Sequence, residues 1–254
     1  MKLEGKVAIV TGASAGIGRA IATLFAKEGA VVYAVARRTE RLKELQECTK
    51  DFAGEVIPYS ADLRNRDQAE RIIDLACKDQ GKLDVLVNNA GVMDDFSPIG
   101  EVSDEMMQNL TDINVMAPFY SIRKAINCFL KQGGGNIINV SSIGGLYGAR
   151  AGAAYTMSKH AIVGLTKNTG FMYAKKNIRC NAICPGGVDT EVGSGEYMKD
   201  LNKTGIDVIM PSTCGNPRSG KSEEIATIAL FLATDASSFI NGQCIVADSG
   251  WTAF

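Results

Sequence analysis

The sequence contains a single histidine, His160, and no excess of charge of either sign. With one histidine, we expect neither a histidine-based catalytic triad nor a zinc cluster, and we expect no metal site. The chain has 27 Lys and Arg against 28 Asp and Glu, a net charge of −1. Nucleic-acid-binding proteins show a basic excess instead, so we expect no nucleic-acid partner.

Long apolar runs are also missing. No run approaches the ~18 residues that a membrane-spanning helix needs, so we expect no membrane partner. The N-terminal MKLEGKVAIVTG has only a short apolar run and no small-residue cleavage site, which is not typical of a signal peptide. We therefore expect a cytoplasmic protein.

The cysteines form no recognisable framework. There are seven, an odd number, at positions 48, 77, 128, 180, 184, 214 and 244. Cys180 and Cys184 fall in a strand-like run with no histidine or carboxylate partner. We expect buried free thiols and a reducing compartment.

What the chain does contain is a regular alternation of apolar, strand-like runs and segments of helical periodicity, which is typical of an α/β fold. Neither repeats nor linkers interrupt it, so residues 1–254 are predicted to form one domain. The expected strands are 6–11, 30–36, 55–61, 83–89, 133–142, 177–184 and 243–249. The expected helices are 19–30, 38–47, 66–81, 103–131, 153–175 and 222–235.

A glycine cluster joins the first strand to the first helix. Glycines there allow a tight turn and a close backbone approach, and the helix N-terminus offers free N–H groups to a phosphate. An ordinary glycine-rich turn is the alternative. The residues predicted to bind a dinucleotide are Gly12, Ser14, Gly16, Ile17 and Gly18.

The next two strand ends bear on the identity of that dinucleotide. The second strand ends at Ala36, followed by Arg37 and Arg38, so no carboxylate is available for a ribose 2′-OH and a cation can accept a 2′-phosphate. This favours NADP(H), although the arginines could be a solvated pair. Asp62 and Leu63 end the third strand, where an adenine would lie, and Asp62 could equally cap the next helix.

Two asparagine positions have open interpretations. Asn88 and Asn89 are strand-end amides that need partners, so they either tie strands together or touch the cofactor. We place Asn89 in the cofactor site. Asn114, in a helical stretch interrupted near Pro118, is either a tolerated polar residue or a point where the helix is distorted and holds a water leading to Lys159.

The stretch from Ser142 to Lys159 indicates chemistry. If residues from 153 onward are helical, Tyr155 and Lys159 lie one turn apart on one face. An ammonium near a phenol favours the phenolate, and the serine hydroxyl can hydrogen-bond a substrate oxygen. These three residues predict a device that moves a proton to or from an alcohol oxygen. A surface Tyr–Lys pair is the alternative.

The C-terminal third contributes a loop and a long irregular segment. Val188 and Thr190 follow a Pro-Gly turn and are predicted to bind a nicotinamide carboxamide, unless the turn is merely structural. Residues 193–222 have little periodicity and are predicted to form a substrate lid. Its apolar side chains could line a pocket: Tyr197, Met198, Ile206, Val208, Ile209 and Met210.

These motifs together resemble the short-chain dehydrogenase/reductase family, in its single-domain branch of about 250 residues. The resemblance runs end to end through TGASAGIG at 11–18, NNAG at 88–91, Asn114, Ser142, YTMSK at 155–159, PGGVDT at 185–190 and the DSGW ending. It implies a doubly wound Rossmann fold with a seven-stranded parallel sheet, order 3-2-1-4-5-6-7, helices on both faces, and a homotetramer or homodimer.

The resemblance also implies a catalytic tetrad. In it, Tyr155 is the acid/base, Ser142 orients the substrate carbonyl, and Lys159 lowers the tyrosine pKa and holds the nicotinamide ribose. Asn114 anchors a water relay. Two positions depart from the family pattern: Ala15, where NADP-using members often have a basic residue, and Asp248-Ser-Gly250, where relatives end in DGG.

The substrate is the least determined feature. The chain is similar to 3-oxoacyl-carrier-protein reductases, but Asn127 and Phe171 stand where those enzymes dock their carrier with arginines. Nearby Arg123, Lys124, Lys175 and Lys176 could substitute. We expect a bulky apolar alcohol/ketone pair such as a hydroxysteroid or bile acid, with a 3-oxoacyl thioester as the alternative. A non-catalytic NADP(H) sensor is a more distant one.

Overall fold

A computed structural model describes residues 1–191 and 199–254. Seven parallel strands form one sheet in the order β3-β2-β1-β4-β5-β6-β7, which confirms the predicted order. Pro58 lies in β3, at the edge of the sheet, where its missing N–H leaves no central ladder bond unmade. The strands are β1 Val7–Thr11, β2 Val31–Ala36, β3 Glu55–Ser60, β4 Val85–Asn88, β5 Gly135–Val140, β6 Ile178–Pro185 and β7 Cys244–Ala247.

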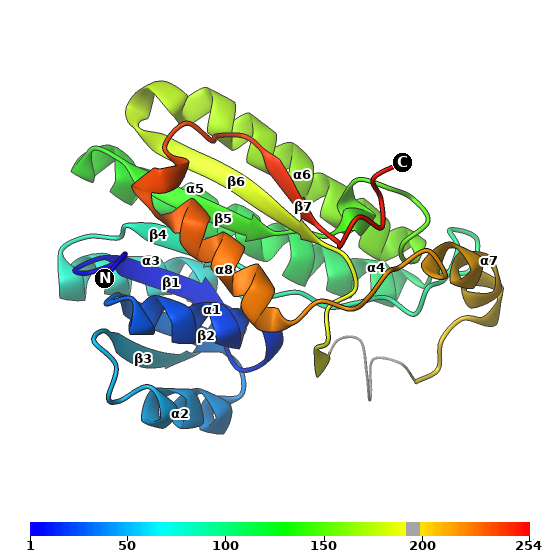
Figure 1. The fold of residues 1–254 in the computed structure, drawn as a ribbon, viewed down its shortest axis with the longest axis horizontal. Helices are drawn as coiled ribbons and strands as arrows, with labels where there is room; N and C mark the ends of the chain where they lie inside the picture. The colour runs from blue at the N-terminus through cyan, green and yellow to red at the C-terminus, as the bar shows by residue number, and fades with distance from the viewer. Residues whose placement is uncertain (192–198) are drawn as a thin grey trace.

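Helices cover both faces of this sheet (Figure 1). On one face, α1 (Gly16–Lys27), α2 (Thr39–Cys48) and α8 (Ser222–Ala233) pack over one buried apolar cluster. On the other face, α3 (Arg66–Gln80), α5 (Ala117–Gln132) and α6 (Ala153–Tyr173) pack over a second cluster. Burial on both faces explains the near-continuous apolar runs of the central strands.

The predicted helix at 103–131 is divided, as expected near Asn114. It consists of α4 (Asp104–Leu110), a π-helical turn at Thr111–Met116, and α5. Such π turns arise where the regular hydrogen-bond ladder is widened by one residue, often at functional sites.

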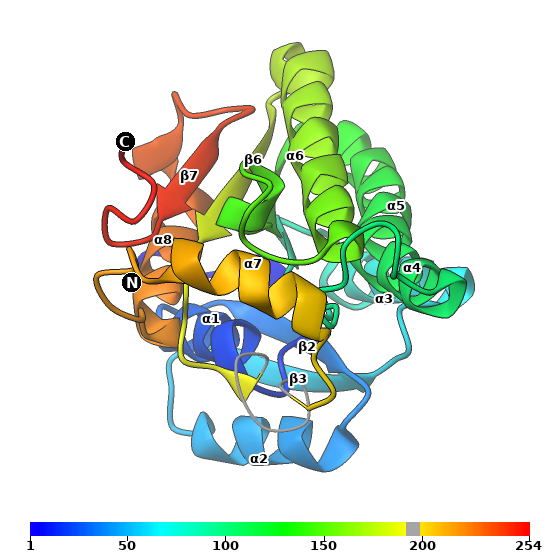
Figure 2. The ribbon, with the colours of Figure 1, turned by 90° about the vertical axis from the view of Figure 1, so that its right-hand side faces the viewer.

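Part of the segment expected to lack regular structure is a helix, α7 (Lys203–Thr213), so that expectation was wrong there. Asn202 caps it by accepting a hydrogen bond from the Gly205 backbone N–H at 2.8 Å. Figure 2 shows α7 lying across the end of the sheet at which the strands terminate. The predicted lid residues Tyr197 and Met198 lie outside the described residues.

The cysteine prediction was wrong for four of the seven residues. Cys77 in α3 and Cys128 in α5 pair as a disulfide, and Cys48 and Cys214 are exposed. Sequence spacing does not reveal the pair because it joins two helices 51 residues apart. Only Cys180 and Cys184 are buried free thiols, and Cys244 is half-buried. Separately, none of the helices in the described ranges is long and apolar enough to cross a membrane.

Candidate active site

A cavity of about 560 Å³ opens at the carboxyl ends of the strands. In doubly wound sheets this is the edge where ligands bind. Of the predicted site residues, Gly18 and Asn114 do not line the cavity but lie directly behind it. The other predicted residues all line it: Gly12, Ser14, Gly16, Ile17, Arg37, Arg38, Asp62, Leu63, Asn89, Ser142, Tyr155, Lys159, Val188 and Thr190.

The turn between β1 and α1 requires its glycines. Gly12 and Gly16 have φ of +68° and +52°, a region that other residues rarely adopt. A Cβ on Gly18 would lie 2.4 Å from the Asn89 amide and from the Gly12 carbonyl oxygen, so close packing excludes a side chain. No side chain caps the α1 N-terminus at Ala15. Its N–H groups therefore suit a phosphate.

The two arginines after β2 both reach the cavity. Arg38 donates to the Ser14 hydroxyl from Nε (3.2 Å) and Nη2 (3.0 Å), and pairs through Nη1 with Glu191 at 2.8 Å. Glu191 also pairs with Arg41. These contacts lower the pKa of Glu191. An anion that binds Arg38 therefore has to displace the Glu191 carboxylate. Arg38 and Glu191 lie 153 residues apart in the sequence.

Asp62 lies beside the cavity as predicted, but it is not a helix cap. Asn65 caps α3, since its side chain accepts a hydrogen bond from the Gln68 N–H. Asp62 instead pairs with Arg64, and the hydrogen bond from this guanidinium lowers the pKa of Asp62.

The two strand-end asparagines have different surroundings: Asn88 contacts a neighbouring strand, and Asn89 lines the cavity. Asn88 donates from its side-chain amide to Oδ1 of the Asn139 side chain in β5 at 2.9 Å and therefore ties neighbouring strands. Asn89 lines the cavity and donates to the Thr11 carbonyl oxygen at 3.0 Å, which fixes the glycine turn from behind.

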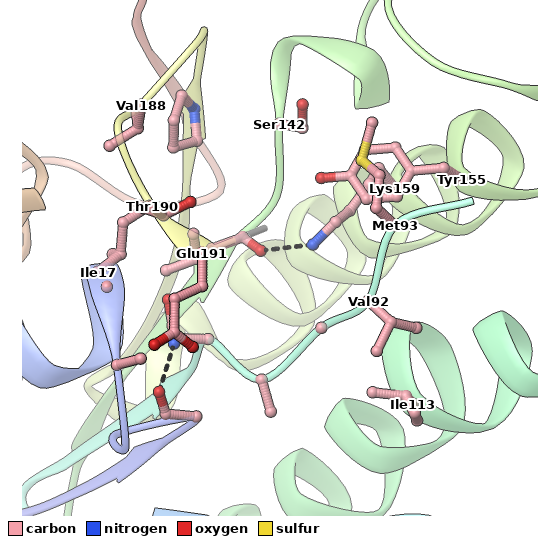
Figure 3. A pocket seen from close by; sticks show the side chains of 18 of the residues that line it. Ile17, Val92, Met93, Ile113, Ser142, Tyr155, Lys159, Val188, Thr190 and Glu191 are labelled. Carbon is pink, nitrogen blue, oxygen red and sulfur yellow. Dashed lines mark hydrogen bonds between the residues drawn. The ribbon is translucent and has the colours of Figure 1, made fainter. Parts of the chain in front are cut away.

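Ser142, Tyr155 and Lys159 come together on one wall of the cavity (Figure 3). Ser142 follows β5, and its hydroxyl accepts from the Gly144 N–H at 3.0 Å. Tyr155 and Lys159 lie one turn apart in α6, with Nζ 5.4 Å from the phenol ring centre. Figure 3 shows Ile17, Val188 and Thr190 on the opposite side.

Asn114 contributes from behind this wall. Its side chain accepts from the Val92 N–H and donates to the Val92 carbonyl oxygen, both at 2.9 Å, and donates to Ser158 Oγ at 3.0 Å. The π turn therefore ties the segment after β4 to helix α6. A Cβ on Gly91 would lie 3.2 Å from Asn114 Oδ1 and 3.4 Å from Lys159 Nζ. Both polar atoms therefore lie close to the Gly91 backbone.

The sequence reasoning missed Asp94, which fixes the start of α6. This buried carboxylate accepts from the backbone N–H groups of Phe96 (3.2 Å), Gly152 (3.1 Å) and Tyr155 (2.8 Å). A Cβ on Gly152 would lie 2.5 Å from Asp94 Oδ2, so the contact requires glycine. Burial raises the pKa of Asp94, and the three N–H donors oppose that shift.

Comparison with known proteins identifies the family. The sequence pattern of the family described as enoyl-(acyl carrier protein) reductase matches residues 12–252. The chain is 41% identical over 253 residues to 3beta-hydroxysteroid dehydrogenase 2 of Eggerthella lenta, covering 99% of this chain and 96% of the relative. The chain belongs to the short-chain dehydrogenase/reductase family.

Two further relatives cover the same length. A 3-oxoacyl-[acyl-carrier-protein] reductase of Thermotoga maritima is 36% identical over 250 residues, 98% of this chain and 99% of the relative. A crystal structure described as an NAD(P)-dependent gluconate 5-dehydrogenase of Beutenbergia cavernae, with NADP bound at low occupancy, has a TM-score of 0.87 and 34% identity. It covers 100% of this chain and 99% of that one. This short-chain dehydrogenase/reductase is therefore an oxidoreductase that takes a nicotinamide cofactor.

Burial dominates the pKa of the Tyr155 phenol in this short-chain dehydrogenase/reductase. Burial raises the pKa of Tyr155 to about 12, opposed by a hydrogen bond with Ser142. Burial also lowers the pKa of Lys159 to about 8, while its Nζ donates to the Val140 carbonyl oxygen at 3.0 Å. Near neutral pH the tyrosine is thus in its proton-donating form.

The buried Lys159 ammonium predicts an unusual pH dependence of stability. Below about pH 8 both folded and unfolded states hold the proton, and the full cost of burying the charge is present. As the pH rises towards the unfolded pKa of about 10.4, only the folded state has lost the proton, so wild-type stability rises. Lys159→Met buries no charge at any pH, so it should be more stable than wild type at neutral pH. In cofactor-free protein, the difference in unfolding free energy between this variant and wild type should therefore decrease by up to roughly 3 kcal/mol as the pH rises over this range.

Urea unfolding between about pH 7 and pH 10 measures this difference. Lys131→Met, at an exposed position near the end of α5, is the matched control, and its difference from wild type should stay flat. A Lys159→Met difference that does not change with pH would show that the ammonium is well solvated in the folded state.

Proposed function

We propose that the chain is an NADP(H)-dependent hydroxysteroid dehydrogenase that interconverts a secondary alcohol and a ketone. One observation carries the proposal: the Tyr155 phenol and the Ser142 hydroxyl lie in the same cavity as the glycine turn and the arginine pair. A proton donor and a dinucleotide cradle thus share one space. The steroid class is supported by the 41% identity to a 3beta-hydroxysteroid dehydrogenase along nearly the whole chain.

The residues of the cradle fit the phosphorylated cofactor. Gly12, Gly16 and the uncapped start of α1 suit the pyrophosphate, and Arg37 and Arg38 suit the 2′-phosphate. We assign Asp62 and Leu63, which line the cavity, to the adenine, and Val188 and Thr190, which also line it, to the nicotinamide. When bound, the nicotinamide supplies or accepts the hydride.

The chain's own residues handle the proton. In reduction, the Tyr155 hydroxyl donates its proton to the carbonyl oxygen, and the Ser142 hydroxyl donates a hydrogen bond to the same oxygen. In oxidation the phenolate must form, which requires positive charge close by. The Lys159 ammonium lies 5.4 Å from the ring centre and contributes to that charge.

We assign Asn114 and Asp94 as positioning residues. Asn114 joins the Val92 backbone to Ser158 in the turn between Tyr155 and Lys159, and Asp94 holds the Tyr155 N–H. Both therefore act on the orientation of the reactive helix and not on the substrate itself.

A 3-oxoacyl thioester is the second candidate substrate, supported by the 36% identity to the Thermotoga maritima reductase. The surface where such a carrier would dock argues against it. Phe171 is 82% exposed where that class of enzyme has an arginine, and two of the nearby cations are already paired, Arg123 with Glu70 and Lys124 with Asp74. A highly acidic carrier would thus meet little free positive charge on α5.

A substrate panel tests the proposal. With NADPH, we expect steady-state reduction of 3-, 7- and 17-ketosteroids to include at least one with kcat/KM about tenfold or more above that for a 3-oxoacyl thioester, the margin of one well-made polar contact. Turnover of the thioester alone would exclude the steroid assignment.

We also propose that the protein assembles as a homotetramer or homodimer. Large exposed apolar side chains at the end of α6, Phe171 and Met172, support this, because they are 82% and 63% exposed in the single chain. Light scattering on the eluting protein would measure the mass directly.

A further inference from the structure

Arg150 is a half-buried cation that lines the cavity. It precedes α6 and lines the same cavity as Ser142 and Tyr155, far along the chain from the arginines of the cofactor end. Neither the motifs nor the proposed function account for it. A guanidinium in a cavity otherwise suited to apolar substrates needs a reason, because such a charge is costly to desolvate without an anionic partner.

Contacts with two other segments of the chain set the direction of the Arg150 guanidinium. Its guanidinium carbon lies 4.6 Å from the centre of the Trp251 ring, and Nη1 donates to the Ser212 carbonyl oxygen at 2.9 Å. Trp251 is 9% exposed and donates from its own Nε1 to the same carbonyl oxygen at 3.1 Å. Three segments, the loop before α6, the end of α7 and the C-terminal turn, therefore meet at one cation.

These contacts leave part of the guanidinium available. Arg150 Nε is buried and has no hydrogen-bond partner, and in the described parts of the chain no carboxylate pairs with Arg150. The remaining contacts of Arg150 are all to neutral groups: two backbone carbonyl oxygens and an indole ring. The guanidinium fork thus keeps its capacity for a charge-assisted bond to an anion.

We propose that Arg150 binds an anionic group carried by the substrate at the end remote from the reacting carbon. This inference rests on the proposed function and narrows it: the substrate is an acidic steroid, with a carboxylate on its side chain, and not a neutral sterol. The Trp251 ring lies against the guanidinium and forms an apolar wall beside it. The Ser212 carbonyl oxygen, at the end of α7, accepts a hydrogen bond from Arg150 and so fixes the direction of the side chain. Arg150 is accordingly a specificity-determining residue with no part in the proton transfer.

The test compares an acid with its neutral ester. We expect 3-oxo-5β-cholanoic acid to have a KM about tenfold to a hundredfold below that of its methyl ester with the wild-type protein, the range of one charge-assisted hydrogen bond. Arg150→Met should raise the KM of the acid by that factor, with kcat and the KM of the ester little changed. Arg150→Lys should fall between the two, because it keeps the charge but loses the fork.

Arg71→Gln is the matched control, since it removes the same charge from the exposed surface of α3 and should change neither KM. A purely structural role for Arg150 predicts a different result: Arg150→Met would change the acid and the ester equally. Equal KM values for the acid and the ester with the wild-type protein would also overturn the inference while leaving a steroid dehydrogenase in place.

A binding measurement keeps the inference separate from the proposed function. Trp251 is the single tryptophan and lies against Arg150, so its fluorescence reports a ligand there without any turnover. We expect the acid to change this emission at a concentration about tenfold or more below the ester, and the difference to vanish in Arg150→Met. If coenzyme A thioesters alone show Arg150-dependent binding, the anion is a phosphate and the acidic-steroid assignment fails.

Discussion

Replacing Tyr155 by phenylalanine should reduce ketone-dependent NADPH oxidation by about 10²- to 10⁴-fold, the usual contribution of a positioned proton donor. The phenol lines the cavity and is in its protonated form near neutral pH, since burial raises its pKa to about 12. The variant keeps the shape of the wall and loses only the hydroxyl. Stopped-flow measurement at saturating cofactor isolates the chemical step.

The control is Tyr173→Phe, which removes a hydroxyl from the same helix at a position outside the cavity. Its rate should match wild type, and NADPH binding should be unchanged in both variants. Equal rates in Tyr155→Phe and wild type would remove the phenol from the mechanism and leave only Ser142 as a donor.

Replacing Arg38 by glutamine should raise the KM for NADPH by about ten- to a hundredfold and leave the KM for NADH nearly unchanged. A bond between a guanidinium and a phosphate is charge-assisted, and only NADPH carries the 2′-phosphate that would accept it. Arg37→Ala should act in the same direction, because Arg37 lines the same part of the cavity. A wild-type preference for NADH would contradict the cofactor assignment.

Glu191 provides an internal check on this prediction. In the structure its carboxylate occupies Arg38 and Arg41 together, so it competes with a 2′-phosphate for Arg38. Glu191→Gln should therefore lower the KM for NADPH several-fold. We expect no larger change, because one exposed ion pair contributes at most about 1 kcal/mol of free energy. Arg41→Gln separates the two contacts, since Arg41 reaches Glu191 but does not line the cavity.

Much of the fold and the reactive wall could be predicted from local sequence signals. The order of strands followed from the family resemblance, and the Tyr155–Lys159 spacing placed both side chains on one face of a helix. The glycine turn was equally local, since Gly12 and Gly16 take up conformations that few other residues adopt.

The features that were missed depend on contacts between distant segments. Asp94 and Gly152 are 58 residues apart, and Arg150 and Ser212 are 62 apart. Neither pair has a sequence pattern that could reveal it. Helix α7 was missed for another reason: it contains Pro211 and Gly205, both poor helix formers, and exposes Val208 and Met210, so its apolar pattern is weak.

The lid residues show the same limit. Among the described members of the predicted pocket lining, Ile206, Val208, Ile209 and Met210 do not line the cavity, whereas Thr213 at the end of the same helix does. The direction of a helix relative to a cavity is set by tertiary packing, which composition alone does not report.

The bond of Asp94 to the first turn of α6 has a consequence for engineering this protein. Asp94 anchors the proton donor to the crossover after β4, because it accepts from the backbone N–H groups of Gly152 and Tyr155. The start of α7 is tied to the same crossover, since the Asn202 N–H donates to the Asp95 carbonyl oxygen at 2.8 Å. An exchange of α7 and the C-terminal turn around Trp251 for those of a relative should therefore include residues 94–96, so that both contacts are kept. Such chimeras should take on the substrate preference of the relative, while Ser142, Tyr155 and Lys159 keep their positions.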